Sequence, residues 1–328
     1  MCMRFRVVSF ILGFLMALAC FSVSTHPVLA FAISPVVVDL EVDPGTAAQG
    51  KVQITNTDGK DQTYYIGVQN FVAKGEDGAQ DFLPESDITG LASWITPQTR
   101  SVRLGANETR EFGYAVNVPK NAEPGGHYAA MFFSTVPLNS DRGSAVGVGA
   151  KTGLLFLLRV PGDIREDARI ESFRVNSGQI DRLPAYFEMR VRNLGNVHFK
   201  PEGNVVIKNF LGQEVAKVPL NPRKSSVLPN SIRRIDTVWA KTFDVSSGGF
   251  FTELKNEWKN FAIGRYTAVA EGFYGVRKQS LAASVVFWVV PWRLIVVTVF
   301  ALLILVGCLK LYHRFVVNSA VKKIRSQF

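Results

Sequence analysis

The chain has 328 residues and a formal net charge of +10, from 37 Lys and Arg against 27 Asp and Glu. Eight of the basic residues and none of the acidic ones lie in the first 31 residues or from Arg293 onward, which leaves 29 basic and 27 acidic residues in between. The excess charge belongs to the two ends and does not predict a nucleic-acid-binding surface. The three cysteines also lie at the ends, which excludes disulfides and thiolate metal sites from the middle of the chain.

The N-terminus, residues 1–32, has the pattern of a secretory signal peptide. Two arginines precede an apolar run from Val7 to about Val23, and small residues follow at Ala30 and Ala32. This order of basic, apolar and small residues is typical of a cleaved export signal. We expect cleavage after Ala32, with Ala30 as the second choice and an uncleaved N-terminal anchor as the alternative.

The next 260 or so residues predict an all-β fold of two tandem immunoglobulin-like β-sandwich domains, at 33–163 and 164–290. Short runs rich in Val, Ile, Phe, Tyr and Thr are separated by Gly, Pro, Asn and Asp, as in strands and turns. The predicted strands include Lys51–Thr55, Tyr64–Val72, Glu111–Val118, Tyr128–Thr135, Gly153–Val160, Tyr186–Val191, Val205–Lys208 and Tyr266–Phe273.

An internal repeat supports two copies of one unit. Ile33 precedes Asn56 by 23 residues, and Ile170 precedes Asn193 by the same spacing. Each asparagine follows a predicted strand and begins a turn, where Asn tolerates a positive φ.

The first domain carries a long connection, from about Lys74 to Gln98, that the second lacks. Loops of this length inside compact domains are often functional. We therefore predict partner binding by its acidic and aromatic side chains, namely Glu76, Asp77, Asp81, Phe82 and Trp94.

The second domain carries an insertion at Ser246–Gly264. Its apolar residues recur at helical spacing, which predicts an amphipathic helix near 249–262. We expect the apolar face to cover its own sandwich, with membrane or partner contact as the alternative.

A tract from Leu281 to Leu309 contains a single charge, Arg293. Read as one helix, it would put this charge near the middle of a membrane, at a cost of about 2.5–3.5 kcal/mol. Pro291 suits the first turn of a helix and ends the element before it. The sequence therefore predicts a strand at Ser280–Val290 and a transmembrane helix at 291–312.

The flanks of this helix predict its orientation. Trp292 and Arg293 are expected at the outer membrane interface, and Lys310 and Arg314 at the inner one. The tail, 313–328, is basic and has no acidic residue. By the positive-inside rule the tail is cytoplasmic, and the protein is a single-pass protein of the cell membrane with both domains extracytoplasmic.

The charge differs between the domains. Residues 33–163 hold 10 basic and 15 acidic side chains, and residues 164–292 hold 19 and 12. The basic domain lies next to the membrane, where cations are attracted to anionic lipid. Contact with anionic lipid or anionic wall polymer is one hypothesis, and an ordinary solvated surface is the other.

No enzyme motif is present, and we predict no catalysis, no cofactor and no metal. G-x-S-x-G, H-E-x-x-H and C-x-x-C are all missing from the sequence. Asp39, Glu41 and Asp43 alternate along a predicted strand, but three carboxylates in a row seldom converge on one ion. A solvated strand edge is the favoured interpretation.

Several motifs resemble the first domain of the WxL-interacting cell-surface proteins of bacteria. They are I-S-P-V-x-x-x-L at Ile33–Leu40, V-x-I-T-N-T at Val52–Thr57 and P-G-G-H-Y-A at Pro124–Ala129. The second sandwich, the C-terminal helix and the basic tail continue the likeness along the chain. The resemblance implies that the first domain contacts peptidoglycan and the second a surface partner.

Two functions follow as expectations. The first is a membrane-anchored binding or display protein that contacts cell-wall glycan or surface proteins. The second is a chaperone-like or structural subunit that holds other envelope proteins by strand pairing, for which an exposed, pairable strand edge in the first domain would be the mark.

Overall fold

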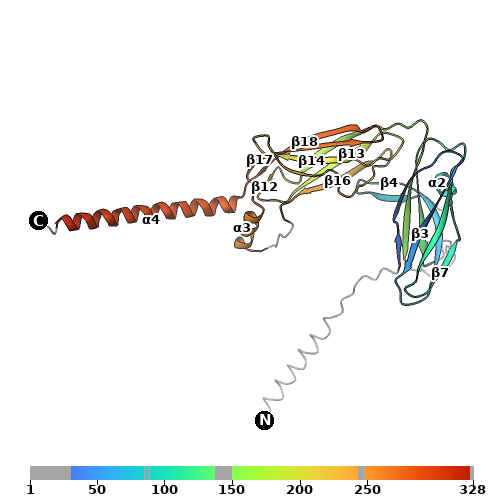
Figure 1. Cartoon of the computed structure of the whole chain (residues 1–328), viewed down its shortest axis with the longest axis horizontal. Coiled ribbons are helices and arrows are strands. Elements are labelled where there is room, and N and C mark those ends of the chain that lie inside the picture. Colours follow the sequence, from blue (N-terminus) through green and yellow to red (C-terminus); the bar gives the residue numbers. More distant parts are fainter. Residues whose placement is uncertain (1–30, 85, 88, 137–149, 243–247, 326–328) are drawn as a thin grey trace, which may run out of the picture.

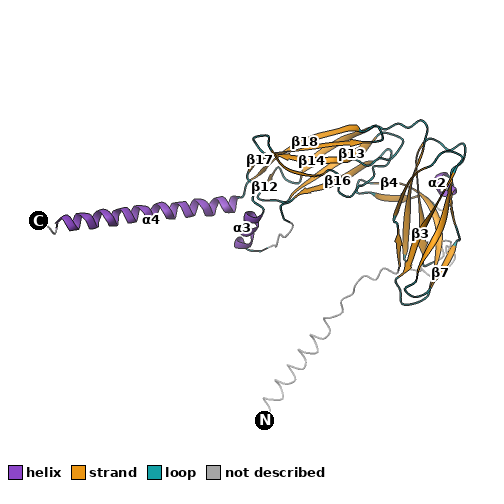
Figure 2. Ribbon diagram, in the orientation of Figure 1, coloured by secondary structure: helices purple, strands orange, loops and turns teal. Residues whose placement is uncertain are grey.

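The computed structural model describes residues 31–325 apart from 85, 88, 137–149 and 243–247. Two β-sandwiches are followed by a long helix, which confirms the predicted all-β, immunoglobulin-like class. Figure 1 shows the sandwiches meeting at an angle, with helix α4 extending from the far end of the second. Figure 2 shows that strands dominate both sandwiches and that the helices α2 and α3 are short.

The first sandwich has a four-stranded and a six-stranded sheet. The strand order is β1-β3-β8-β6 in one, and β2-β10-β9-β4-β5 in the other, where β7 also pairs with β4. The elements are β1 (Phe31–Ser34), β2 (Val37–Glu41), β3 (Ala47–Asn56), β4 (Gln62–Lys74), β5 (Ala79–Phe82), α2 (Gly90–Trp94), β6 (Ile95–Pro97), β7 (Ser101–Leu104), β8 (Thr109–Asn117), β9 (Gly125–Ser134) and β10 (Lys151–Val160).

The second sandwich has a three-stranded sheet, β11-β13-β16, and a five-stranded sheet, β12-β18-β17-β14-β15. Its elements are β11 (Ala168–Val175), β12 (Gln179–Ile180), β13 (Ala185–Asn193), β14 (Glu202–Lys208), β15 (Glu214–Pro219), β16 (Ile232–Trp239), α3 (Phe250–Lys259), β17 (Gly264–Tyr274) and β18 (Gln279–Val289). All the predicted strands lie within or overlap the observed ones, because alternating apolar residues specify which side of each strand is buried.

The two sandwiches share one feature of their topology. In the first, β1 pairs antiparallel with β3, and the chain then crosses to the other sheet, where β2 pairs parallel with β10. In the second, β11 pairs antiparallel with β13, and β12 pairs parallel with β18. The repeat predicted from the sequence is therefore a repeat of topology.

Asn56 closes the first of the two repeated turns. Its side chain is fully buried, and its Nδ2 donates to the carbonyl oxygens of Lys60 and Gly105, each at 2.8 Å. Its Oδ1 accepts from the Asp58 N–H at 3.0 Å and from the Tyr64 hydroxyl at 2.9 Å. All four hydrogen-bonding positions of the amide are used, so this asparagine ties two loops and a core tyrosine together.

Asn193 occupies the corresponding place in the second sandwich. It is also fully buried, and its Nδ2 donates to the carbonyl oxygens of Val197 and Val227, each at 2.9 Å. Its Oδ1 accepts from the Gly195 N–H at 2.9 Å. The sequence predicted a turn at both asparagines, and the structure adds that each one fastens its turn to a distant loop.

The predicted long connection at 74–98 is not a single loop. It contains strand β5, helix α2 and strand β6, and its first part is a hairpin in which Lys74 pairs with Ala79. Sequence periodicity missed these elements because each has only three to five residues.

The orientation predicted for the inserted helix, α3, was wrong. Phe251 is 81% exposed and Trp258 is 73% exposed, whereas Asn256 and Glu257 are buried. The polar side faces inward because it contacts the start of α4, and periodicity alone gives a helix two sides without saying what each side meets.

The C-terminal helix, α4 (Trp292–Arg325), begins directly after Pro291, and β18 ends at Val289, close to the predicted division. Its segment Trp292–Asn318 is long and apolar enough to cross a membrane. The helix continues beyond the predicted end at residue 312 into the basic tail, because no proline or glycine interrupts it there.

The predicted signal peptide lies outside the described residues except for its last two. Phe31 begins β1, is 2% exposed and places its ring 4.7 Å from that of Tyr64. Cleavage after Ala32 would remove this core side chain and half of β1. If the segment is removed, the structure therefore favours the second predicted position, after Ala30.

Candidate functional site

The edge of β10 is only partly covered. β10 pairs with β9 along its whole length, but with β2 only from Leu155 to Arg159. The Leu155 N–H donates to the Val36 carbonyl at 3.0 Å, so the odd-numbered residues of β10 direct their backbone groups away from β9. Lys151 and Gly153 share this direction, and no strand among the described residues pairs with them on this side. Within the described part of the chain, two N–H and two C=O groups are thus left on an open edge.

The side chains beside this edge leave it open. Lys151 folds over the outer face of the sheet, with its Nζ 4.0 Å from the centre of the Phe132 ring and 3.1 Å from Gln69 Oε1. Leu154 points the other way and is fully buried in the core. A lysine usually protects a strand edge, but this one is held against the sheet face. We call Lys151–Leu154 the β10 edge.

Other sheet edges among the described residues also carry unpaired backbone groups. In the second sandwich, β12 pairs with β18 only at Trp288 and Val289, and β11 of the other sheet lies alongside β18, as β1 lies alongside β10. In the first, the part of β3 that β1 leaves uncovered carries Lys51, which is paired with Glu111 at 2.9 Å.

A partly buried polar cluster around His198 joins the two sandwiches. Asp39 of β2 lies 3.0 Å from His198 Nε2 and accepts a hydrogen bond from Lys200 Nζ at 2.6 Å. The hydroxyl of Tyr128, on β9, lies 3.2 Å from His198 Nδ1. The contact with His198, followed by that with Lys200, holds the pKa of Asp39 well below its usual range, while burial raises the pKa of Tyr128. Asp39 was predicted as a solvated edge residue; it lies on the edge strand β2 and is exposed, and it also links the two domains.

The tip of the β4–β5 hairpin makes a second link. Glu76 forms a two-pronged ion pair with Arg190 of β13, and its carbonyl accepts from the Arg234 N–H at 2.8 Å. Asp77 pairs with the Arg234 side chain at 3.0 Å. Hydrogen bonding from Arg190 lowers the pKa of Glu76. Two predicted partner-binding residues thus contact the neighbouring domain of the same chain.

The other three predicted partner-binding residues lie apart from that tip. Asp81 pairs with Lys74 at 3.3 Å on the exposed side of the hairpin. Phe82 is 39% exposed and packs edge-on against Phe132, at 4.8 Å between ring centres. Trp94, on α2, lies 4.6 Å from the His127 ring. The structure therefore does not gather the five predicted residues into one patch.

Between the two links lies a cavity of 430 Å³. Its wall in the first sandwich is apolar and includes Phe71 and Leu155, while the second sandwich contributes basic side chains that include Arg223 and Arg233. Arg233 Nε is buried without a hydrogen-bond partner, and burial lowers the pKa of this guanidinium. The cavity combines an apolar wall with positive charge. No local sequence pattern predicts it, because its two walls lie far apart in the chain.

The predicted anchor residues occupy α4. Arg293 Nη1 donates to Asp181 Oδ2 at 2.7 Å and to Glu257 Oε1 at 2.8 Å, and its guanidinium lies 4.6 Å from the Trp292 ring. Lys310 and Arg314 lie further along the helix and are exposed.

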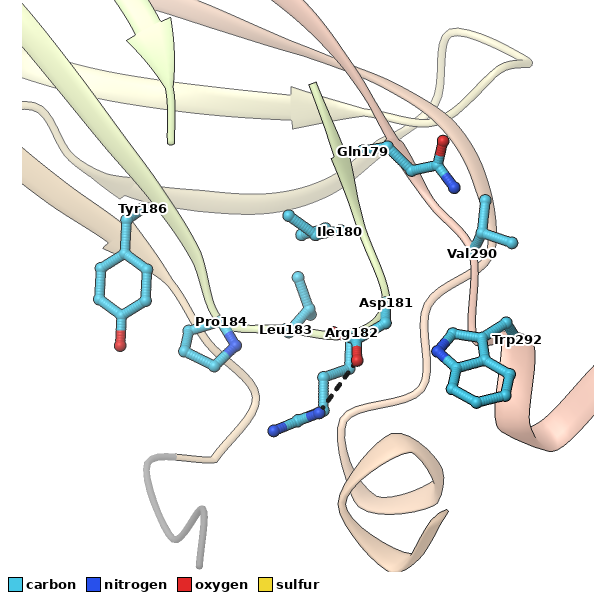
Figure 3. A pocket seen from close by; sticks show the side chains of 9 residues that line it. All are labelled: Gln179, Ile180, Asp181, Arg182, Leu183, Pro184, Tyr186, Val290 and Trp292. Atoms are coloured by element: carbon cyan, nitrogen blue, oxygen red, sulfur yellow. Dashed lines mark hydrogen bonds and ion pairs between the residues drawn. The ribbon is translucent and has the colours of Figure 1, made fainter. Parts of the chain in front are cut away.

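An open groove of 790 Å³ lies beside this end of the second sandwich. Figure 3 shows it between the segment Gln179–Pro184 and Trp292. Arg182 projects into it and is paired with Asp181 at 3.2 Å. It also pairs with Glu253 of α3 at 2.6 Å. Its charge is thus already balanced.

No protein-family model matches this chain, and no curated protein matches its sequence, so the resemblance to WxL-interacting proteins stays a prediction. Among solved structures it is similar to the class 5 fimbrial chaperone CfaA, with 12% identity over 80% of this chain and 99% of that one, at a TM-score of 0.37. It is also similar to the chaperone YadV, with 9% identity over 79% and 100% of the two chains, at a TM-score of 0.36. The chaperone CupB2 of Pseudomonas aeruginosa has 10% identity over 79% and 100%, at a TM-score of 0.33. Similarity at this level assigns neither a family nor a function to the chain.

Proposed function

We propose that this protein holds another extracytoplasmic protein at the membrane by pairing a strand of that protein with the β10 edge. The role is binding and not catalysis. The observation that carries the proposal is the set of unpaired backbone groups at Lys151 and Gly153, at the end of a strand that is otherwise paired on both sides. Added strands obtain affinity from such main-chain hydrogen bonds.

The links between the sandwiches suit this role. The Asp39–His198 contact and the Glu76–Arg190 pair join residues that are distant in sequence, and each is partly shielded from water. They would hold the two domains at one angle, so that a strand bound at the β10 edge keeps a defined place relative to α4. In this proposal both sandwiches lie outside the membrane and the basic tail lies inside, in keeping with the positive-inside rule.

A proline at Lys151 tests the proposal. Proline removes one outward N–H from the edge, whereas Lys151→Ala removes the same side chain and keeps the N–H. Because that N–H points away from β9, neither change breaks the β9–β10 ladder. A photo-crosslinking residue at Val36, which is 58% exposed and bonds to Leu155 at the end of the edge, would report the bound partner in cells.

We expect Lys151→Pro to reduce the crosslinked adduct several-fold and Lys151→Ala to leave it near the wild-type amount. Equal capture by the proline variant, with an unchanged melting temperature, would show that the partner does not pair with this edge. Binding to cell-wall glycan, the other predicted role, stays a prediction, to be checked by sedimentation with insoluble peptidoglycan.

A further inference from the structure

Helix α3 presents its aromatic side to the outside. Phe251 and Trp258 are 81% and 73% exposed, and Phe250 and Phe261 are also exposed. Exposed aromatic side chains this close together are unusual on a surface that meets only water, and they mark a region that contacts something apolar.

The inward side of α3 is fixed by polar contacts with the first turn of α4. Glu257 is fully buried, and its two carboxylate oxygens accept from Arg293 Nη1 at 2.8 Å and from the Leu294 N–H at 2.9 Å. A carboxylate at a helix N-terminus is stabilised by the free N–H groups there. Arg182 ties Glu253, one turn earlier on α3, to the same end of the sandwich at 2.6 Å. The helix therefore cannot turn its aromatic side inward without breaking the contacts of Glu257 with Arg293 and Leu294.

The turn between β14 and β15 adds apolar surface at the same end of the second sandwich. Lys208, the last residue of β14, is opposite Thr267, and Gly264 of the same strand β17 is opposite Val289, where the chain leaves for α4. The turn holds Phe210, which is 71% exposed, and Leu211, which is 66% exposed. This turn is therefore beside the start of α4.

We name this surface the membrane-proximal patch, and it consists of Phe210, Leu211, Phe250, Phe251, Trp258, Phe261 and Ile263. Figure 1 shows α3 beside the start of α4 and away from the first sandwich. The opposite end of the same sandwich, at the β17–β18 turn, has one exposed apolar side chain, Val276, followed by Arg277 and Lys278. Apolar exposure thus concentrates at the end from which the candidate membrane span emerges.

We propose that the membrane-proximal patch inserts into the headgroup region of the membrane that α4 crosses. Trp and other aromatic rings favour this region because it accommodates an apolar body with a polar edge. Lys255 is exposed on the same short helix and suits the phosphates of anionic lipids. The second sandwich is then seated on the bilayer in one orientation and does not swing freely about the span. This inference depends on α4 crossing the membrane, and not on which partner the β10 edge binds.

Depth measurement by spin labelling tests the proposal on the full chain in vesicles of phosphatidylcholine and phosphatidylglycerol. In a background without native cysteines, a nitroxide is placed in turn by Phe251→Cys, Leu211→Cys and Val276→Cys, all at positions of similar exposure in the protein. A label at Phe300, an exposed residue of α4, reports whether the helix is inserted. Accessibility to oxygen, which partitions into lipid, is compared with accessibility to a water-soluble nickel complex.

We expect the oxygen-to-nickel ratio to be several-fold higher at 251 and 211 than at 276, and highest at 300. Ratios at 251 and 211 equal to that at 276, with 300 in lipid, would overturn the proposal, because the patch would then face water and be free for a protein. A label at 300 that faces water would overturn it as well, since the span itself would be wrong. An unchanged melting temperature checks that each labelled chain is folded.

Discussion

Replacing Asn56 by alanine should selectively destabilise the first sandwich. The side chain is fully buried and takes part in four hydrogen bonds, with Lys60, Gly105, Asp58 and Tyr64. Alanine removes a partner from all four groups, in a place where water has little access. At about 1 kcal/mol of net stability per hydrogen bond, the loss is about 4 kcal/mol. That is a large part of the 5–15 kcal/mol typical of a whole domain.

Native-state hydrogen exchange of the full chain in detergent micelles would locate this loss, because exchange in core strands reports the unfolding of each domain separately. We expect faster exchange in β3 and β8 of Asn56→Ala and no change in β13 and β16. Asn193→Ala should produce the opposite pattern, and Asn121→Ala, at an exposed position, should change neither. If Asn56→Ala exchanges no faster than Asn121→Ala, the turn is not held by this amide and the reasoning fails.

Two further predictions concern the junction and the second core. The pKa of Asp39 is depressed mainly by its contact with His198, so its stabilising contribution is complete above the ordinary pKa of about 4 and is lost as the pH falls below that value. Urea titrations should therefore show wild type to be more stable than Asp39→Asn at about pH 6 to 7, where the carboxylate is charged, and the difference should shrink toward low pH. A difference that does not change with pH would contradict this assignment. Gly203 has φ +132°, and a Cβ there would lie 2.3 Å from the Glu271 carbonyl oxygen, so Gly203→Ala should lower stability by about 1–3 kcal/mol in thermal unfolding. Gly178→Ala, with nothing within 4 Å of the added Cβ, should have little effect, and equal losses for both glycines would argue against close packing as the cause.

The sequence predicted most of the fold because the relevant signals are local. Alternating apolar residues, as in Tyr64–Val72, identify a strand and its buried side wherever it lies in the sandwich. The spacing of Asn56 and Asn193 predicted the repeat, because the same turn chemistry was needed twice. Pro291 similarly separated β18 from α4 through its own backbone restriction.

The candidate site depended on contacts that no local pattern encodes. The five residues predicted to bind a partner were chosen for their loop and their chemistry, yet Glu76 and Asp77 meet arginines more than a hundred residues away. The sequence of the β4–β5 hairpin tip would be the same whether its acidic side chains were free or engaged in ion pairs. Only the angle between the domains decides which of the two is present.

By itself, the sequence determined two sandwiches, their repeated turns and an apolar helix after Pro291, because each follows from the periodicity or conformational preference of neighbouring residues. The tertiary structure decided which strand edge stays open and which side of α3 faces outward. Both depend on what packs nearby: β2 covers only the second half of β10, and Arg293 and Leu294 hold Glu257 inward. A buried charge is stable only when it is paired. Because Glu257 faces inward to pair with Arg293, the aromatic side of α3 faces outward, at the end where the chain enters α4.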